Sequence, residues 1–223
     1  MDSIYTLLLR WSWSLLLALS VLGTGALAAD SLPPEVSALR SDWDHANFAL
    51  QGDTQKEAML ELVGRCAPLL ETLVENQAAL TWCGIVKASY AGKAGALSAM
   101  KYAKAARKDF EAALKLGDGE TVGAANISLG TLYFKVPGWP VGFGDDDRAK
   151  ELLEAGLAAD PNGIDANFYM ADFLYEDGDL EAAREHLERA AMTPATPGRD
   201  IAYKARQDEV AVLLAKVEKK LAR

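Results

Sequence analysis

The stretch MADFLYEDGDLEAAREHLERA, from Met170 to Ala190, repeats a pattern of small and large apolar residues that the chain has already shown once, from Leu129 onward. The first copy consists of Leu129, Gly130, Tyr133, Ala149, Leu153 and Gly156, and it closes at Pro161. The second consists of Met170, Ala171, Leu174, Gly178, Ala183, Leu187 and Ala190, and it closes near Pro194. Each copy predicts two helices joined by a turn, because small residues suit a close helix approach and large ones fill the space between hairpins.

This spacing resembles that of the tetratricopeptide repeat, a helix-turn-helix unit with a period of about 34 residues. The resemblance covers roughly residues 77–195, over three units. A single unit cannot bury its apolar face alone, so such units stack and present a concave surface. The pattern therefore favours an interaction protein over an enzyme.

The residues before the repeats have the features of a signal peptide. Arg10 supplies a positive charge, an apolar run follows from Trp11 to Gly23, and Ala26-Leu27-Ala28 offers a small-x-small cleavage site. The alternative is an uncleaved membrane anchor, but the apolar run is shorter than the roughly 20 residues of a spanning helix. We therefore expect residues 1–28 to be removed, leaving residues 29–223 as one periplasmic helical repeat domain.

Composition narrows the class of partner. Cleavage would remove Asp2 and Arg10, so the net charge of the mature chain stays at −9. A nucleic-acid partner is disfavoured, because phosphate binding requires a concentrated basic face. With no cysteine directly after the cleavage site, we expect neither a lipid anchor nor stable membrane insertion. The many Ala and Leu residues favour packed helices over sheet.

The flanking segments complete the predicted stack. Pro33-Pro34 opens a helix that Gly52-Asp53 ends, and Thr54-Gln55-Lys56-Glu57 has the pattern of a capping box at the start of the next. These two helices fit the repeat spacing poorly and predict a degenerate N-terminal hairpin. A C-terminal capping helix should bury one side, formed by Ala202, Ala205, Val210, Leu213, Leu214, Val217 and Leu221. The predicted fold is an all-α, tetratricopeptide-type solenoid of helical hairpins.

Two repeat units contain extra residues. Gly84 and Ala106 are 22 positions apart, where a standard unit has about 12, which predicts an insertion around residues 91–100. A second insertion, KVPGWPVGFG, occupies residues 135–144. With the signal segment, these Gly-rich and Trp-Pro insertions resemble a bacterial periplasmic group related to the T-component of TRAP-type transporters. That resemblance implies an accessory component that contacts a substrate-binding protein and holds a small apolar ligand in a central channel.

The sequence offers no catalytic set. His45 and His186 lie far apart without metal-ligand spacing around them, and His186 is expected on a solvated helix face. The run Asp145-Asp146-Asp147 fits helix capping better than calcium binding, because it lacks the alternate-residue spacing of a calcium loop. We expect no enzyme activity, metal or cofactor.

Cys66 and Cys83 are the only cysteines. They are expected on consecutive antiparallel helices joined by a turn near Asn76, and export would place them in an oxidising compartment. The axial offset of roughly 5 Å permits a disulfide only with a favourable turn. A bridge and two buried thiols therefore remain equally open.

The loop around Trp139 is the best candidate for a binding surface. Pro137 and Pro140 stiffen it, and it carries two aromatic rings, Trp139 and Phe143. The interpretation that we favour is structural: both rings fold back over the hairpin and seal the stack. In the alternative, the loop contacts a peptide or ligand together with further aromatics of the concave face. The candidate binding residues are Tyr133, Trp139, Phe143, Phe168 and Tyr169.

These observations predict a periplasmic binding or scaffold protein that acts through a protein or peptide partner. The alternative function is that of a carrier of a small apolar ligand, or of an accessory component of a TRAP-type uptake system. An apolar tunnel would favour the carrier, and an open groove with exposed aromatics would favour the scaffold.

Overall fold

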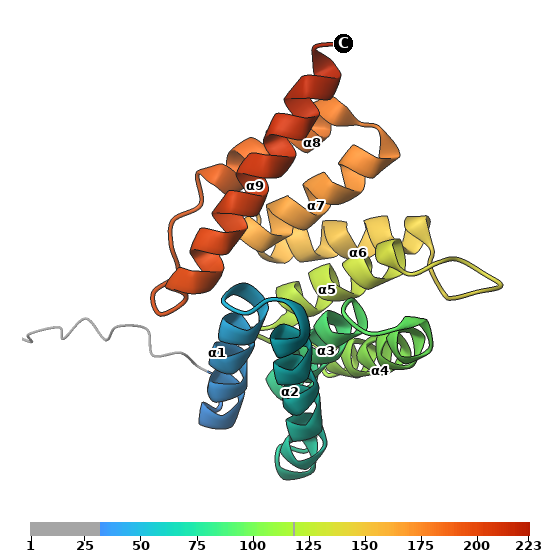
Figure 1. Cartoon of the computed structure of the whole chain (residues 1–223), viewed down its shortest axis with the longest axis vertical. Coiled ribbons are helices and arrows are strands. Elements are labelled where there is room, and N and C mark those ends of the chain that lie inside the picture. Colours follow the sequence, from blue (N-terminus) through green and yellow to red (C-terminus); the bar gives the residue numbers. More distant parts are fainter. Residues whose placement is uncertain (1–31, 118) are drawn as a thin grey trace, which may run out of the picture. The chain divides into compact units, whose positions relative to one another are not determined.

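The structure, a computed structural model, describes residues 32–117 and 119–223, which form nine α-helices (Figure 1). They are α1 (Pro34–Phe48), α2 (Gly52–Thr72), α3 (Gln77–Ala91), α4 (Ala96–Lys115), α5 (Val122–Lys135), α6 (Asp146–Ala159), α7 (Ile164–Asp177), α8 (Leu180–Ala191) and α9 (Asp200–Leu221). Within these residues, the isolated bridge between Gly138 and Gly144 is the one β feature. No helix in this part of the chain is both long and apolar enough to cross a bilayer. The predicted signal segment and its cleavage site lie outside the described residues.

The helices form two layers. Each helix packs against the next in the chain, which gives the hairpins α1–α2, α3–α4, α5–α6 and α7–α8, followed by α9. The first helices of successive hairpins also contact one another, from α1 through α3, α5 and α7 to α9. We call these five the inner helices and the other four the outer helices. The predicted all-α solenoid of helical hairpins is confirmed.

The inner helices also make one contact that joins the two ends of the stack. Helix α9 packs against α1, in addition to α7 and α8. The contacts of the inner helices therefore run in a closed circuit, α1–α3–α5–α7–α9–α1. In an open solenoid each repeat touches only its neighbours, so this closure is an added feature of the fold.

The predicted repeat register is correct. The four alanines placed between paired helices, Ala106, Ala113, Ala183 and Ala190, are all fully buried. Gly84 shows why a small residue is needed: a Cβ there would lie 2.5 Å from Cε1 of the buried Phe110 ring. Gly130 has the same role between α5 and α6, where a Cβ would lie 2.9 Å from Cγ of Leu153. Close approach within each hairpin therefore depends on these small residues.

The predicted capping box at Thr54 is wrong. Helix α2 begins two residues earlier, at Gly52, and its N-cap residue, Gln51, makes no side-chain capping bond. Gln55 fixes the turn instead, because its Nε2 donates hydrogen bonds to the carbonyl oxygens of Ala46 and Asn47. These carbonyls lie at the end of α1, where the last turn of a helix leaves acceptors free.

The two predicted insertions have different structures. Residues 91–100 do not form a loop, because α3 continues to Ala91 and α4 begins at Ala96. Most of the extra residues are helical, in keeping with the high helix propensity of Ala, Leu and Met. The second insertion is a loop, as predicted, and residues 136–145 connect α5 to α6.

A pair of glycine variants tests the packing inside the second hairpin. Gly84→Ala should lower the free energy of unfolding by about 1–3 kcal/mol, because its methyl group would overlap the Phe110 ring. Gly64→Ala is the control, since Gly64 lies inside α2 with no atom within 4 Å of an added Cβ. It should be neutral or stabilise the protein by up to about 1 kcal/mol through helix propensity. Urea denaturation measures both, and equal effects would contradict the packing of α3 on α4.

Candidate functional site

The inner helices surround a cavity of about 460 Å³. Every inner helix contributes to its wall, and Gly156 of α6 and Asp160, directly after α6, complete it. It is lined by Trp43, Trp82, Ile85, Ala88, Ser89, Gly92, Gly123, Ala124, Ile127, Ser128, Thr131, Leu132, Lys135, Gly156, Asp160, Asp165, Ala166, Tyr169, Arg199 and Arg206. Its volume falls within the range of about 300–1,000 Å³ that is common for ligand pockets.

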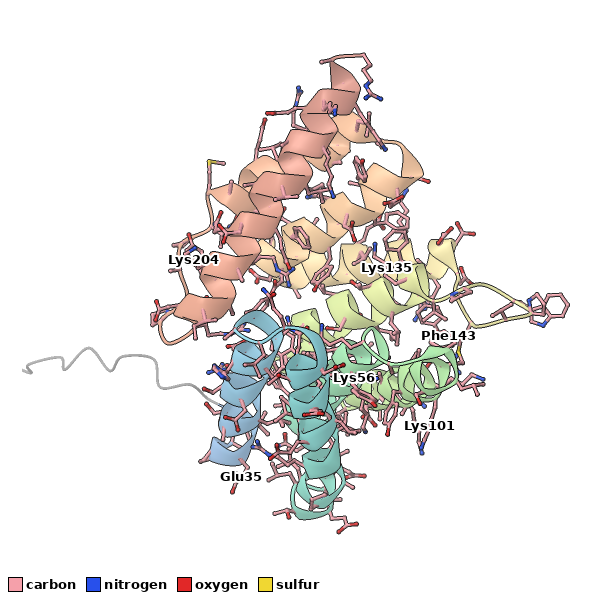
Figure 2. All side chains as sticks on the ribbon, in the orientation of Figure 1. Glu35, Lys56, Lys101, Lys135, Phe143 and Lys204 are labelled. Carbon is pink, nitrogen blue, oxygen red and sulfur yellow. The ribbon has the colours of Figure 1, made fainter. Side chains whose placement is uncertain are left out.

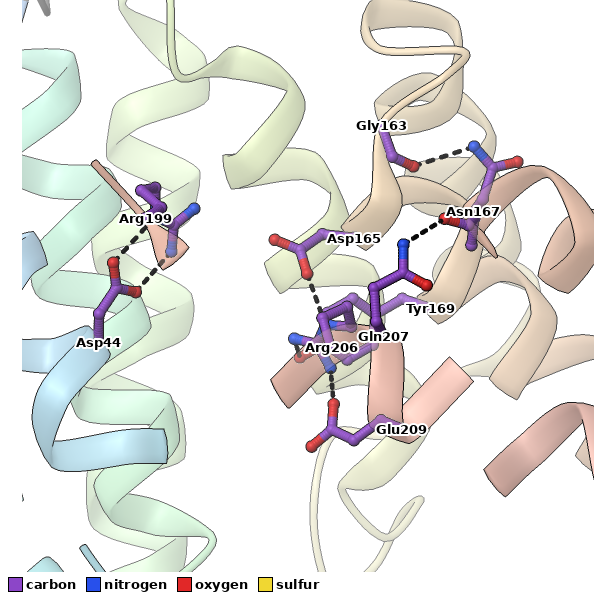
Figure 3. A network of polar contacts seen from close by, with 10 residues as sticks. Asp44, Gly163, Asp165, Asn167, Tyr169, Arg199, Arg206, Gln207 and Glu209 are labelled. Carbon is purple, nitrogen blue, oxygen red and sulfur yellow. Dashed lines mark hydrogen bonds and ion pairs between the residues drawn. The ribbon is translucent and has the colours of Figure 1, made fainter. Parts of the chain in front are cut away.

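An ion pair that joins the two ends of the stack lies beside this cavity, and its arginine, Arg199, is one of the lining residues. Arg199, at the start of α9, donates from Nε to Oδ2 of Asp44 at 2.9 Å and from Nη2 to Oδ1 at 2.6 Å (Figure 3). The Asp44 side chain is 9 % exposed and that of Arg199 is 20 % exposed. We call this bidentate pair the clasp. Fork-shaped Arg–carboxylate pairs of this kind fix orientation as well as distance.

Aromatic rings surround the clasp. The Arg199 guanidinium lies over the Trp82 ring, 5.7 Å from its centroid. Trp43 meets Trp82 edge to face at a centroid distance of 5.7 Å, and its Nε1–H donates to Oγ of Ser89 at 2.9 Å. Helices α1 and α3 and the start of α9 are therefore held together by ring contacts as well as by charge.

A second arginine, Arg206, is buried in the wall formed by α7 and α9. Its Nε donates to Oδ1 of Asp165 at 2.7 Å, its Nη2 to the Tyr169 hydroxyl at 3.0 Å, and its Nη1 to Glu209 (Figure 3). Burial disfavours the charged guanidinium, but Tyr169, Asp165 and Glu209 outweigh that effect and raise the pKa of Arg206. This side chain is thus a permanently charged, fully paired group inside the fold.

Burial also acts on the phenol beside it. It raises the pKa of Tyr169 above its ordinary value, although the neighbouring Arg206 acts in the opposite direction. The Tyr169 hydroxyl therefore stays protonated at neutral pH. This hydroxyl forms a hydrogen bond within the cavity wall and does not act as a base.

The cavity combines apolar walls with cations that already have partners. Lys135 pairs with Asp172 at 2.7 Å, Arg199 with Asp44, and Arg206 with Asp165. Most of the remaining lining consists of aromatic, aliphatic and small side chains. Such a site recognises a ligand by shape and apolar contact more than by charge. Among the described residues, no group of three His, Cys, Asp or Glu side chains is placed to hold a metal ion.

The structure separates the five predicted binding residues. Only Tyr169 lines the cavity. Phe168 lies next to it, with ring centroids 5.3 Å apart, and both rings lie against the Arg206 guanidinium. Tyr133 and Phe143 form a different pair, edge to face at 5.6 Å. Trp139 contributes to neither group, so the five residues do not form one continuous surface.

The prediction that both rings of the Trp139 loop seal the stack is wrong for Trp139 and right for Phe143. Phe143 packs on Tyr133 and lies under the Arg107 guanidinium, 4.5 Å from its ring centroid. Trp139 is 89 % exposed. The loop turns back on itself through a hydrogen bond of 2.9 Å from the Gly144 N–H to the Pro137 carbonyl oxygen. This turn holds Trp139 away from its own hairpin.

The remaining polar predictions have mixed outcomes. Asp145 caps α6 as expected, because its Oδ1 accepts from the Arg148 N–H at 3.0 Å. His186 does not lie on a solvated face: it is half-buried, and its Nδ1 lies 3.0 Å from Oδ1 of Asn167. Asn167 uses its amide nitrogen to donate to the carbonyls of Pro161 and Gly163. Its oxygen must then accept, so the His186 Nδ1 carries the proton.

Cys66 and Cys83 are buried free thiols on neighbouring helices. The Cys83 Sγ donates to the Cys66 carbonyl oxygen at 3.8 Å. The neighbouring Cys66 and burial raise the pKa of the Cys83 thiol, which keeps it protonated and unreactive. Of the two alternatives that the sequence left open, the structure has the two buried thiols.

Sequence reasoning missed the other lining residues, among them Trp43, Trp82, Arg199 and Arg206. One signal was present, because Arg206 falls four positions after Ala202 and four before Val210, within the apolar side of α9. The clasp had no such signal, since its two partners are 155 positions apart.

One comparison with known proteins extends the fold assignment. Residues 142–206 match the family model described as tetratricopeptide repeat. The match spans α6, α7, α8 and the start of α9. No curated protein matches the sequence. The match and the all-helical stack together support a tetratricopeptide repeat protein, a class that generally acts by binding other proteins.

The clasp should contribute strongly to stability. Asp44→Ala leaves Arg199 without its buried partner and should cost about 3 kcal/mol of unfolding free energy. Asp42→Ala is the matched control: Asp42 also lies on α1 and pairs with Arg65 at 2.6 Å, but both side chains are exposed. It should cost less than about 1 kcal/mol. Urea denaturation measures the unfolding free energy of both variants. Similar unfolding midpoints for the two would contradict a structural role of the clasp.

The two rings of the Trp139 loop should behave differently on truncation. Phe143→Ala removes packing against Tyr133 and Arg107 and should cost about 2 kcal/mol, less than a fully buried ring. Trp139→Ala should leave stability within about 0.5 kcal/mol, as at ordinary surface positions. A comparable loss in both variants, measured by thermal and urea unfolding, would mean that Trp139 is packed.

Proposed function

We propose that this protein is an exported, periplasmic tetratricopeptide-type binding protein that holds a segment of a partner protein in the cavity between its inner helices. The observation that carries the proposal is the cavity of about 460 Å³, to which all five inner helices contribute. The proposed location rests on the signal-like residues 1–28. The proposed kind of partner rests on the general role of tetratricopeptide repeats.

The chemistry of the lining supports a peptide segment with apolar side chains. Trp43, Trp82 and Tyr169 offer aromatic surface, and Ile127 and Leu132 offer aliphatic surface. Ser128 and Thr131 add hydroxyl groups within the same wall, which suit the polar backbone of a bound segment. With the cations already paired, apolar side chains of the segment would supply most of the affinity.

The carrier of a small apolar ligand, as in an accessory component of a TRAP-type uptake system, is the second candidate. The closed circuit of inner helices favours it, because closure restricts the length of chain that can pass through the cavity. A ligand enclosed between Trp43, Trp82 and Tyr169 would be shielded from water on several sides.

One substitution tests whether the cavity binds at all. Ser128→Phe places a ring in the cavity from α5, and Ala211→Phe adds the same ring at an exposed position of α9 outside the cavity lining. Each protein, beginning at Ala29, would be immobilised and exposed to periplasmic extract, and the captured proteins would be identified by mass spectrometry. Capture should be reduced at least tenfold in Ser128→Phe and unchanged in Ala211→Phe.

Native mass spectrometry of the purified protein separates the two candidates. A retained small molecule that is displaced in Ser128→Phe, without any captured protein, would favour the carrier. Equal capture by both variants would contradict binding in the cavity.

The location has its own test, because the protein recovered from the periplasm should begin at Ala29 or Asp30.

A further inference from the structure

The charge of this acidic chain is unevenly distributed. Residues 76–108 contain no Asp or Glu, although the whole chain has a net charge of −9. The same stretch carries Lys87, Lys93, Lys101, Lys104, Arg107 and Lys108. Four of these six cations lie on α4, an outer helix. Lys87 pairs with Asp109 and Arg107 with Glu111, so the exposed excess of positive charge lies on α4, and such an excess attracts an anionic partner.

Three of the α4 cations share one face with an exposed leucine. Leu97, Lys101, Lys104 and Lys108 follow at intervals of four, three and four residues, which places them in one row along the helix. All four are exposed, and Leu97, at the start of α4, is 93 % exposed. An apolar residue at the end of a row of lysines makes this face amphipathic along its length.

The Trp139 loop lies beside this row. A Cβ on Gly142 would lie 3.0 Å from Cε of Met100, and Phe143 lies under Arg107, so the loop runs along the flank of α4. Figure 2 shows Phe143 and Lys101 on these neighbouring segments. The loop exposes two more apolar residues, Trp139 at 89 % and Val141 at 70 %. We call Leu97, Lys101, Lys104, Lys108, Trp139 and Val141 the α4–loop surface.

The loop holds its apolar residues outward by backbone hydrogen bonds. The N–H groups of Val141 and Gly142 donate to the Gly138 carbonyl oxygen at 3.2 and 3.1 Å. The Gly144 N–H donates to Pro137 across the base of the turn. Trp139 therefore lies in a defined turn. Because the turn is already ordered, less conformational entropy is lost when the exposed ring binds a partner.

We propose that the α4–loop surface binds peripherally to an anionic lipid bilayer. Trp is well suited to the bilayer interface, because its ring is apolar and its N–H can reach polar headgroups. Leu97 and Val141 would insert at the level of the headgroups, while the lysines of α4 contact lipid phosphates with their stems along the apolar boundary. The combination of inserted apolar residues and adjacent cations is what reversible membrane association requires.

A bilayer fits this surface better than an acidic protein does. Trp139, Val141 and Leu97 protrude from a turn and from the start of a helix, and protein interfaces seat such rings in shaped pockets. A bilayer accepts protruding apolar groups without a matching pocket. Its phosphates also form a continuous plane of charge, which complements a row of lysines along a helix.

The α4–loop surface is separate from the cavity. None of its six residues lines the cavity, and α4 belongs to the outer layer. Membrane association and ligand capture can therefore be lost independently, so failure of one proposal leaves the other intact.

Vesicle sedimentation tests the proposal. The protein beginning at Ala29 is used, because an attached apolar N-terminal segment would itself bind lipid, and residues 31–223 form one compact unit. It should sediment with vesicles made from a mixture of phosphatidylcholine and phosphatidylglycerol. With vesicles of pure phosphatidylcholine it should stay in the supernatant. The double variant Lys101→Ala/Lys104→Ala should lower the partition coefficient on the order of 20-fold at low salt, given about fivefold per surface lysine. The double variant Lys150→Ala/Lys216→Ala changes the net charge equally and should bind like the parent protein.

Tryptophan fluorescence adds a measurement that would not change if the protein bound vesicles through charge alone. In the protein beginning at Ala29, the tryptophans are Trp43, Trp82 and Trp139, and the first two are buried. Anionic vesicles should therefore shift emission to shorter wavelength, and brominated lipids should quench it. Both effects should be absent in Trp139→Ala, whose partition coefficient should also fall.

Three results would overturn the proposal. The first is equal binding to neutral and anionic vesicles. The second is an equal loss of binding in the two lysine double variants. The third is no binding to anionic vesicles. Capture of an acidic protein from extract that depends on Lys101, Lys104 and Trp139 would then assign the surface to a protein partner.

Discussion

The ion pair between Asp44 and Arg199 determines whether the inner face of this stack is an open groove or a cavity. Nearly all other helix contacts join neighbours in the chain or neighbouring hairpins, as in any solenoid. Such contacts alone would leave a concave groove open along one side. The clasp brings α9 against α1, so that residues of all five inner helices line one cavity. The candidate binding site exists in this form because the two ends meet.

The electrostatics of the inner layer follow from the cost of burying charge. A guanidinium removed from water is tolerated only when its donors find acceptors of opposite charge. Asp44 provides them for Arg199, and Asp165 and Glu209 do so for Arg206. With their charges compensated, these arginines orient helices and leave the ligand space largely apolar. The outer helix α4 shows the opposite arrangement, where a row of lysines faces solvent.

The sequence predicted those features that depend on local spacing. Small residues at Gly84, Gly130, Ala106 and Ala183 identified the hairpins and their register, because helix periodicity and close packing act within one unit. Features that depend on contacts between distant segments were missed. No periodicity relates Asp44 to Arg199, and the outward position of Trp139 depends on backbone hydrogen bonds of its loop that composition does not specify. Of the residues that line the candidate site, only Tyr169 was therefore predicted, while Trp43, Trp82 and both arginines were missed.

Closure also limits how this architecture can change in evolution. An open solenoid gains or loses hairpins by duplication and deletion, because every internal repeat is equivalent and the ends are free. Here a fifth hairpin would move α9 away from α1, and the loss of one would bring the two into a different orientation. Asp44 and Arg199 could then no longer meet in bidentate geometry. The number of repeats is thus fixed by a single contact, and variation is confined to loops and outer surfaces such as the α5–α6 connection.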